Sequence, residues 1–160
     1  MSMVRTWKTM SGARVENVFG EVVKATASGQ RIVHVGCDSQ QHGLKTEFVS
    51  VIVLLNPGKG GRVFWSRERV DRISSLRERL LKEVWLSVEV ALQLSAVLSE
   101  DVEISVHVDA NPNTKFKSSC IVKEMVGMVV GQGFTALTKP ESWVATHVAD
   151  HVVKHKNERL

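Results

Sequence analysis

The sequence predicts an α/β domain with a five-stranded mixed sheet, helices on both faces and an extra N-terminal helix. Three strand-like segments follow one another between residues 31 and 66, joined by short turns, which is typical of an antiparallel meander. Beyond residue 70, strand-like and helical segments alternate, which favours α–β units with parallel strands. The 160 residues suffice for one compact domain and are too few for two.

The first half of the chain predicts one helix and the meander. Valines and Phe19 recur at helical spacing over residues 13–26, which predicts an amphipathic helix. The β-branched segments 31–38 and 45–55 predict the first two strands. A turn rich in Gly and Pro leads into the third strand, RVFWS, at residues 62–66.

The second half predicts a long helix over about residues 70–98, where leucines and valines keep helical spacing. Residues 102–109 alternate strictly between apolar and polar side chains, as a strand does. A helix ending at Gly131 and Gly133 is expected next, followed by the short strand FTALT. Pro140 opens a last helix that reaches about Lys154.

The order along the chain is therefore β-β-β-α-β-α-β-α after the leading helix. The domain is expected to span residues 13–156, between an N-terminal tail (1–12) and a C-terminal tail (157–160).

Composition excludes several classes of protein. The chain is 43% hydrophobic and 24% charged, which is ordinary for a folded protein and not for a disordered one. It has no apolar run of membrane-spanning length and no secretory pattern at its start, so a cytoplasmic protein without a membrane partner is expected. Cys37 and Cys120 match no paired metal-ligand spacing, which argues against a structural zinc site. The net charge of +4 suits a polyanionic partner, although such an excess also occurs in proteins that bind none.

Three aspartates occupy positions that favour metal binding. Asp38 closes the first predicted strand and Asp109 the fourth, so parallel neighbouring strands would place both carboxylates at one edge of the sheet. Asp150 lies in the last predicted helix. Converging carboxylates repel unless cations bind, and Mg²⁺ or Mn²⁺ prefers such oxygen ligands. Taken singly, each aspartate could instead form a turn, cap a helix or, for Asp150, pair with Lys154.

The segments that hold these aspartates resemble a known family. VGCDSQ, HVDANPN…KFKSS and KPESWVATHVADHVVK look like the YkuK-type predicted ribonuclease H-like nucleases, in the order found in that family and over nearly the whole chain from about residue 14. The resemblance implies a ribonuclease H-like fold in which Asp38, Asp109 and Asp150 bind the metal ions. It also implies that a glutamate of the first long helix takes part in the site. Glu83, which lies beside the apolar stripe, is favoured over Glu78 and Glu89.

Other residues are candidates for contacts with nucleic acid. Ser39 and Gln40 follow Asp38 directly. They either donate hydrogen bonds to a phosphate or a metal-bound water, or they only pair with backbone groups at the end of the strand. Lys115 and Lys117 lie at a predicted helix start, where backbone N–H groups favour phosphate, although exposed lysines need no such role.

Histidines and tryptophans complete the set of candidates. His147 and His151 flank Asp150 and are candidate proton shuttles, because histidine titrates near neutral pH. His34 and His107 either meet across paired strands near the site or are structural. Trp65, Trp85 and Trp143 could stack on bases, and Trp143 is the favoured candidate. Core packing is expected for Trp85, and either role is left open for Trp65.

The leading hypothesis is a Mg²⁺- or Mn²⁺-dependent nuclease with a metal pair about 4 Å apart, acting on RNA, an RNA–DNA hybrid or structured DNA. The alternative is a non-catalytic module of the same fold that binds nucleic acid or a protein. A phosphohydrolase or ATPase ranks last, because the chain has no Gly-x-x-x-x-Gly-Lys-Ser/Thr motif.

Overall fold

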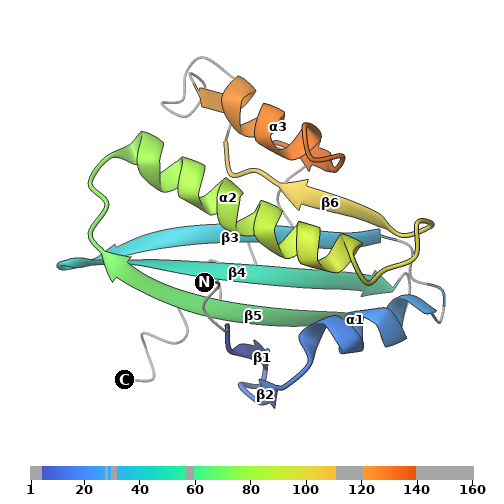
Figure 1. Cartoon of the computed structure of the whole chain (residues 1–160). Helices are drawn as coiled ribbons and strands as arrows, with labels where there is room; N and C mark the ends of the chain where they lie inside the picture. Colours follow the sequence, from blue (N-terminus) through green and yellow to red (C-terminus); the bar gives the residue numbers. More distant parts are fainter. Residues whose placement is uncertain (1–4, 28, 30–31, 57–59, 111–120, 140–160) are drawn as a thin grey trace.

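The computed structural model (Figure 1) describes residues 5–27, 29, 32–56, 60–110 and 121–139. In these ranges the chain forms β1 (Trp7–Thr9), β2 (Arg14–Val15), α1 (Val18–Ala27), β3 (Ile32–His42), β4 (Lys45–Asn56), β5 (Gly60–Asp71), α2 (Leu76–Ser95), β6 (Glu103–His107), α3 (Val122–Val130) and β7 (Thr135–Leu137). From β3 to β7 the element order is the predicted one. The predicted last helix lies outside the described residues.

The sheet is mixed, as predicted. Its strand order is β2-β1-β5-β4-β3-β6-β7. Strands β3, β4 and β5 form the antiparallel meander, and β1 and β2 extend it beyond β5. Strand β6 pairs in parallel with β3 on one side and with β7 on the other. The two parallel pairs therefore lie at the end of the sheet that the α–β units build.

The prediction of five strands is wrong, because the described sheet has seven. Strand β1 falls within residues 1–12, which the sequence assigns to a tail, and β2 takes the start of the expected helix 13–26, so that α1 begins only at Val18. Trp7 is 4% exposed and lies opposite Ser66 of β5, which anchors the added hairpin. Gly12 has φ of 93°, a conformation that glycine allows in its turn.

Two strands are longer than predicted. Strand β3 continues to His42 and β5 to Asp71, so residue 70 belongs to a strand and not to the following helix. These extensions are polar, and their pairing partners stabilise them: Glu47 of β4 lies between Gln40 and Arg69 in the register. Helix α2 then begins after Ser75, whose hydroxyl accepts a hydrogen bond from the backbone N–H of Glu78 at 3.2 Å.

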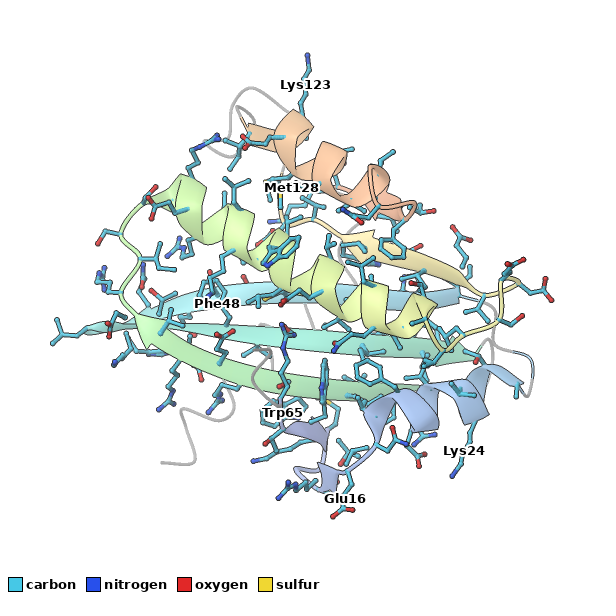
Figure 2. All side chains as sticks on the ribbon, viewed as in Figure 1. Glu16, Lys24, Phe48, Trp65, Lys123 and Met128 are labelled. Carbon is cyan, nitrogen blue, oxygen red and sulfur yellow. The ribbon has the colours of Figure 1, made fainter. Side chains whose placement is uncertain are left out.

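The described helices cover one face of the sheet. Buried residues of α1, α2 and α3 form one hydrophobic cluster with alternate residues of the strands, among them Val33, Val35, Ile52, Leu54 and Phe64. Figure 2 shows the two faces, with Phe48 on the side of α2 and Trp65 on the other. The expectation of helices on both faces therefore depends on the predicted last helix, which is not described.

Helix α2 presents its apolar stripe to the sheet as predicted, and Leu80, Val84 and Val88 are buried. The expectation of core packing for Trp85 is wrong, because this side chain is 47% exposed. Trp85 follows Val84 directly, about 100° further around the helix, and so it points away from the stripe. No helix within the described ranges has both the length and the apolar character that crossing a membrane requires.

Candidate metal centre

Strands β3 and β6 bring Asp38 and Asp109 to the same edge of the sheet. Their parallel pairing joins residues 32–35 to residues 103–106. Strand β6 ends at His107, whereas β3 continues to His42. Asp38 therefore lies just past the paired segment and Asp109 just past the end of β6. Both aspartates thus lie at the same edge of the parallel pair, as expected, but the prediction that Asp38 closes its strand is wrong, because β3 continues to His42 on its pairing with β4.

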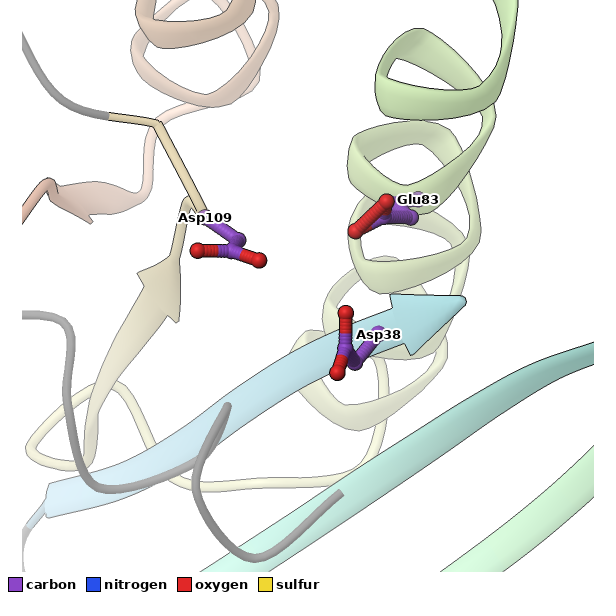
Figure 3. A group of neighbouring side chains, drawn as sticks. All are labelled: Asp38, Glu83 and Asp109. Carbon is purple, nitrogen blue, oxygen red and sulfur yellow. The ribbon is translucent and has the colours of Figure 1, made fainter. Parts of the chain in front are cut away.

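Glu83 of α2 completes a cluster of three carboxylates (Figure 3). It lies on the inward side of the helix, next to Val84, and is 4% exposed. One carboxylate oxygen from each of Asp38, Glu83 and Asp109 lies within 4.8 Å of the others. Of the candidates on this helix, Glu83 is thus the one in the cluster; Glu78 is exposed, and Glu89 pairs with Arg5 at 2.8 Å. Asp150 lies outside the described residues.

The environment of Glu83 disfavours its charge. Burial, followed by the charges of Asp38 and Asp109, raises the pKa of the Glu83 carboxyl well above its usual value. Ser39 Oγ donates a hydrogen bond to Glu83 Oε2 at 3.0 Å. Glu83 Oε1 is buried and has no hydrogen-bond partner among the described residues. A buried carboxylate oxygen without a hydrogen bond destabilises the folded protein, and a divalent cation bound to it would remove this cost in free energy. The three residues therefore fit Mg²⁺ or Mn²⁺, which prefer oxygen ligands.

Local hydrogen bonds orient the other two carboxylates. Asp38 Oδ1 accepts a hydrogen bond from the backbone N–H of Ser39 at 2.9 Å. Asp109 Oδ1 lies 2.6 Å from Nζ of Lys139, and this ion pair raises the pKa of the lysine. The backbone N–H of Lys139 donates to the carbonyl of Ala110 at 3.2 Å, which fixes the lysine beside the site.

Lys139 is the functional candidate that the sequence analysis missed. It follows β7, and β7 pairs in parallel with β6, so its backbone reaches the same edge of the sheet as Asp109. The signal for this position was available, since a strand that follows an α–β unit ends at the edge where ligands gather. The three-residue length of β7 kept that signal weak.

The histidines of β3 and β6 meet, which was one of the two open expectations. Nδ1 of His34 lies 2.8 Å from Nε2 of His107, and His107 is 2% exposed. Burial lowers the pKa of His34, although the charge of Glu103 opposes this effect. The pair joins the two strands that carry Asp38 and Asp109, so it supports the relative position of these strands.

The remaining candidates are placed as follows. The hydroxyl of Ser39 donates a hydrogen bond to the carboxylate of Glu83, which is itself a candidate metal ligand. Gln40 lies on the same strand face as Asp38, and its Oε1 is buried without a hydrogen-bond partner among the described residues. Trp65 is 4% exposed and its Nε1 donates to the Thr9 carbonyl at 2.9 Å, so its ring is not open to a base. Lys115, Lys117, Trp143, His147 and His151 lie outside the described residues.

Comparison with known proteins gives matches to one family. The model of the ribonuclease H-like family matches residues 15–154. The YkuK protein of Bacillus subtilis (strain 168) is 28% identical over 138 residues, which cover 77% of this chain and 79% of that protein. Among solved structures, RNase H1 of Halobacterium salinarum NRC-1 is 16% identical with a TM-score of 0.41, and the N-terminal RNase H domain of rv2228c from Mycobacterium tuberculosis is 11% identical with a TM-score of 0.38. Both matches cover 78% of this chain and 98% of the other.

Proposed function

This chain belongs to the ribonuclease H-like family, and we propose that it is a divalent-metal-dependent nuclease that hydrolyses phosphodiester bonds of RNA, RNA–DNA hybrids or structured DNA. One observation carries the proposal: Asp38, Glu83 and Asp109 converge within 4.8 Å from three different elements. Carboxylates at this separation in a partly buried site repel one another, so a cluster of this kind is suited to hold cations. The net charge of +4 also suits a polyanionic substrate.

Mg²⁺ or Mn²⁺ is the proposed cofactor. Asp38, Glu83 and Asp109 would be ligands, and Asp150 is the proposed fourth. Bound as a pair, such ions supply Lewis-acid stabilisation of the reacting phosphate and activation of water. This chemistry needs acidic side chains and no nucleophilic side chain, in agreement with the residues found together.

The chain's own groups have distinct proposed tasks. Ser39 holds the Glu83 carboxylate in one orientation through the hydrogen bond to Oε2. Gln40 is a proposed contact to the substrate because it lies one strand repeat beyond Asp38 on the same face. Lys115, Lys117 and Trp143 are also proposed to bind nucleic acid, and His147 and His151 are proposed to shuttle protons.

A cleavage panel tests the proposal. Single-stranded, duplex, hybrid and branched substrates are incubated with Mn²⁺ and the wild-type protein, Asp109→Asn or Asp101→Asn. Asp101 is exposed and lies outside the cluster, so its variant is a matched control for the change of charge. We expect Mn²⁺-dependent cleavage by the wild type and Asp101→Asn, and at least a hundredfold loss in Asp109→Asn.

Two results would contradict the proposal. Equal Mn²⁺-dependent cleavage by wild type and Asp109→Asn would show that the cleavage does not depend on the carboxylate cluster. Binding of nucleic acid without cleavage, at an affinity that the Asp109→Asn change leaves unaltered, would favour the non-catalytic module instead.

A further inference from the structure

We propose that the side-chain ammonium of Lys139 competes with divalent metal ions for Asp109 and so lowers the metal affinity of the substrate-free site. This inference rests on the proposed metal-binding role of the carboxylate cluster. It assigns to the site a lower metal affinity than the three acidic residues alone would give.

The first argument is the geometry of the ion pair. Nζ of Lys139 lies 2.6 Å from Asp109 Oδ1, at the distance of a direct charge-assisted hydrogen bond. Metal–oxygen distances for Mg²⁺ are close to about 2.1 Å, so an ion bound to the same oxygen would lie less than about 5 Å from the ammonium. Two cations that close repel each other. Metal binding at Asp109 therefore requires the ammonium to withdraw.

The second argument is that Lys139 is able to withdraw. Its side chain is 48% exposed, whereas that of Asp109 is 24% exposed. The backbone of Lys139 is held by the hydrogen bond to Ala110, so the side chain can move into solvent while the residue stays in place. Displacement of the ammonium thus requires no change in the core.

The third argument concerns charge. Asp38, Glu83 and Asp109 bring up to three negative charges within 4.8 Å, and in the described part of the chain Lys139 is the cation that forms an ion pair with one of them. In the absence of metal it neutralises part of that charge. A cation that reduces repulsion in the metal-free state necessarily reduces the gain in free energy when metal binds.

Binding of Mn²⁺ to the full chain, followed by isothermal titration calorimetry and by the EPR signal of free Mn²⁺, tests the proposal. Lys139→Met is expected to bind Mn²⁺ about five- to tenfold more tightly than wild type, from the loss of one exposed ion pair and of one like-charge repulsion. Lys139→Arg keeps the cation and is expected to bind as wild type does. Lys24→Met is the matched control, because Lys24 lies on α1, which contributes no member of the cluster (Figure 2).

The outcomes separate this inference from the proposed function. Equal or weaker Mn²⁺ binding by Lys139→Met would overturn the inference alone, as would an equal gain in Lys24→Met. Absence of Mn²⁺ binding in wild type and in Lys139→Met alike would overturn the proposed function and the inference with it. Circular dichroism of each variant confirms folding, and Lys139→Gln replaces Lys139→Met if the latter does not fold.

Discussion

Replacing Glu83 with glutamine is expected to stabilise the metal-free protein while weakening its response to metal. The carboxyl of Glu83 is buried beside Asp38 and Asp109, and its pKa is raised by burial first and by these charges second. Glutamine has nearly the same shape, and its amide oxygen can still accept the hydrogen bond from Ser39. The substitution therefore removes a destabilising charge without creating a cavity.

The structure sets the size of the effect. Two unit charges 4.8 Å apart, the upper limit within the cluster, repel by about 3.5 kcal/mol at an effective dielectric constant of about 20. The hydrogen bond from Ser39 is stronger to a carboxylate than to an amide, and Lys139 and Arg79 supply positive charge, so part of this repulsion is already offset. A net gain of about 1–2 kcal/mol is expected, within the range found when functional charges are neutralised. For a chain of this length it raises the Tm by about 3–6 °C.

The gain depends on pH in a defined direction. A carboxyl whose pKa is raised on folding destabilises the protein only where the unfolded chain has lost the proton, which begins near the ordinary glutamate pKa of about 4.5. The stability difference between Glu83→Gln and wild type is therefore expected to be small at pH 4 and to grow as the pH rises through the folded pKa. Above the folded pKa it stays constant.

Thermal unfolding in EDTA between pH 4 and pH 8.5, repeated with Mn²⁺, measures both effects. Glu78→Gln is the control, because Glu78 lies on the same helix and is exposed, and its change is expected within about 0.5 kcal/mol. Mn²⁺ is expected to raise the Tm of wild type more than that of Glu83→Gln. A metal-free Glu83→Gln protein that melts at or below the wild-type temperature at pH 8 would refute the reasoning.

Three further predictions follow from the described contacts. Trp7→Ala should destabilise the protein by about 3–5 kcal/mol in urea unfolding, because the buried indole anchors β1; a loss below 1 kcal/mol would show that the hairpin contributes little to the domain. Ser39→Ala should lower the Tm and reduce the cleavage rate about tenfold, since it leaves Oε2 of the buried Glu83 carboxylate without its hydrogen bond, whereas Ser39→Thr should keep most of the rate; equal rates in all three proteins would contradict this. Burial lowers the pKa of His34, so wild-type stability should fall as the pH drops below about 6.5, and His34→Gln should flatten that dependence in calorimetry; an unchanged slope would show that His34 does not cause the effect.

Much of the fold is predictable because apolar patterning reports on burial. Residues 45–55 carry a nearly continuous apolar run and became β4 almost to the residue, and the helical stripe of Leu80, Val84 and Val88 became the inward side of α2. The missed parts lack such a pattern. Strands β1 and β2 have three and two residues, too few for any period to show. The polar end of β5 is a strand because its partners in β4 stabilise it, which local sequence does not reveal.

The candidate site was predictable to the extent that it depends on strand ends and helix faces. Asp38 and Asp109 lie just beyond the paired segment of two parallel neighbouring strands, and Glu83 borders an apolar stripe, so all three could be named in advance. Lys139 was missed because its place depends on the parallel pairing of β7 with β6, and the three residues of β7 give only a weak signal of that strand. Trp85 was misassigned because a large apolar residue on a helix suggests burial even where its angular position does not.

The register between β3 and β6 links the packing of the interior to the spacing of the acidic side chains. Ile104 lies opposite Val33 and Val106 opposite Val35, which directs both β6 residues into the core. A shift of one residue would turn them outward and displace Asp109 by about 3.3 Å along the strand. The packing that keeps these aliphatic side chains buried therefore also sets the distance between Asp38 and Asp109, and substitutions at these positions should alter the affinity of the proposed site for divalent ions even when every carboxylate is intact.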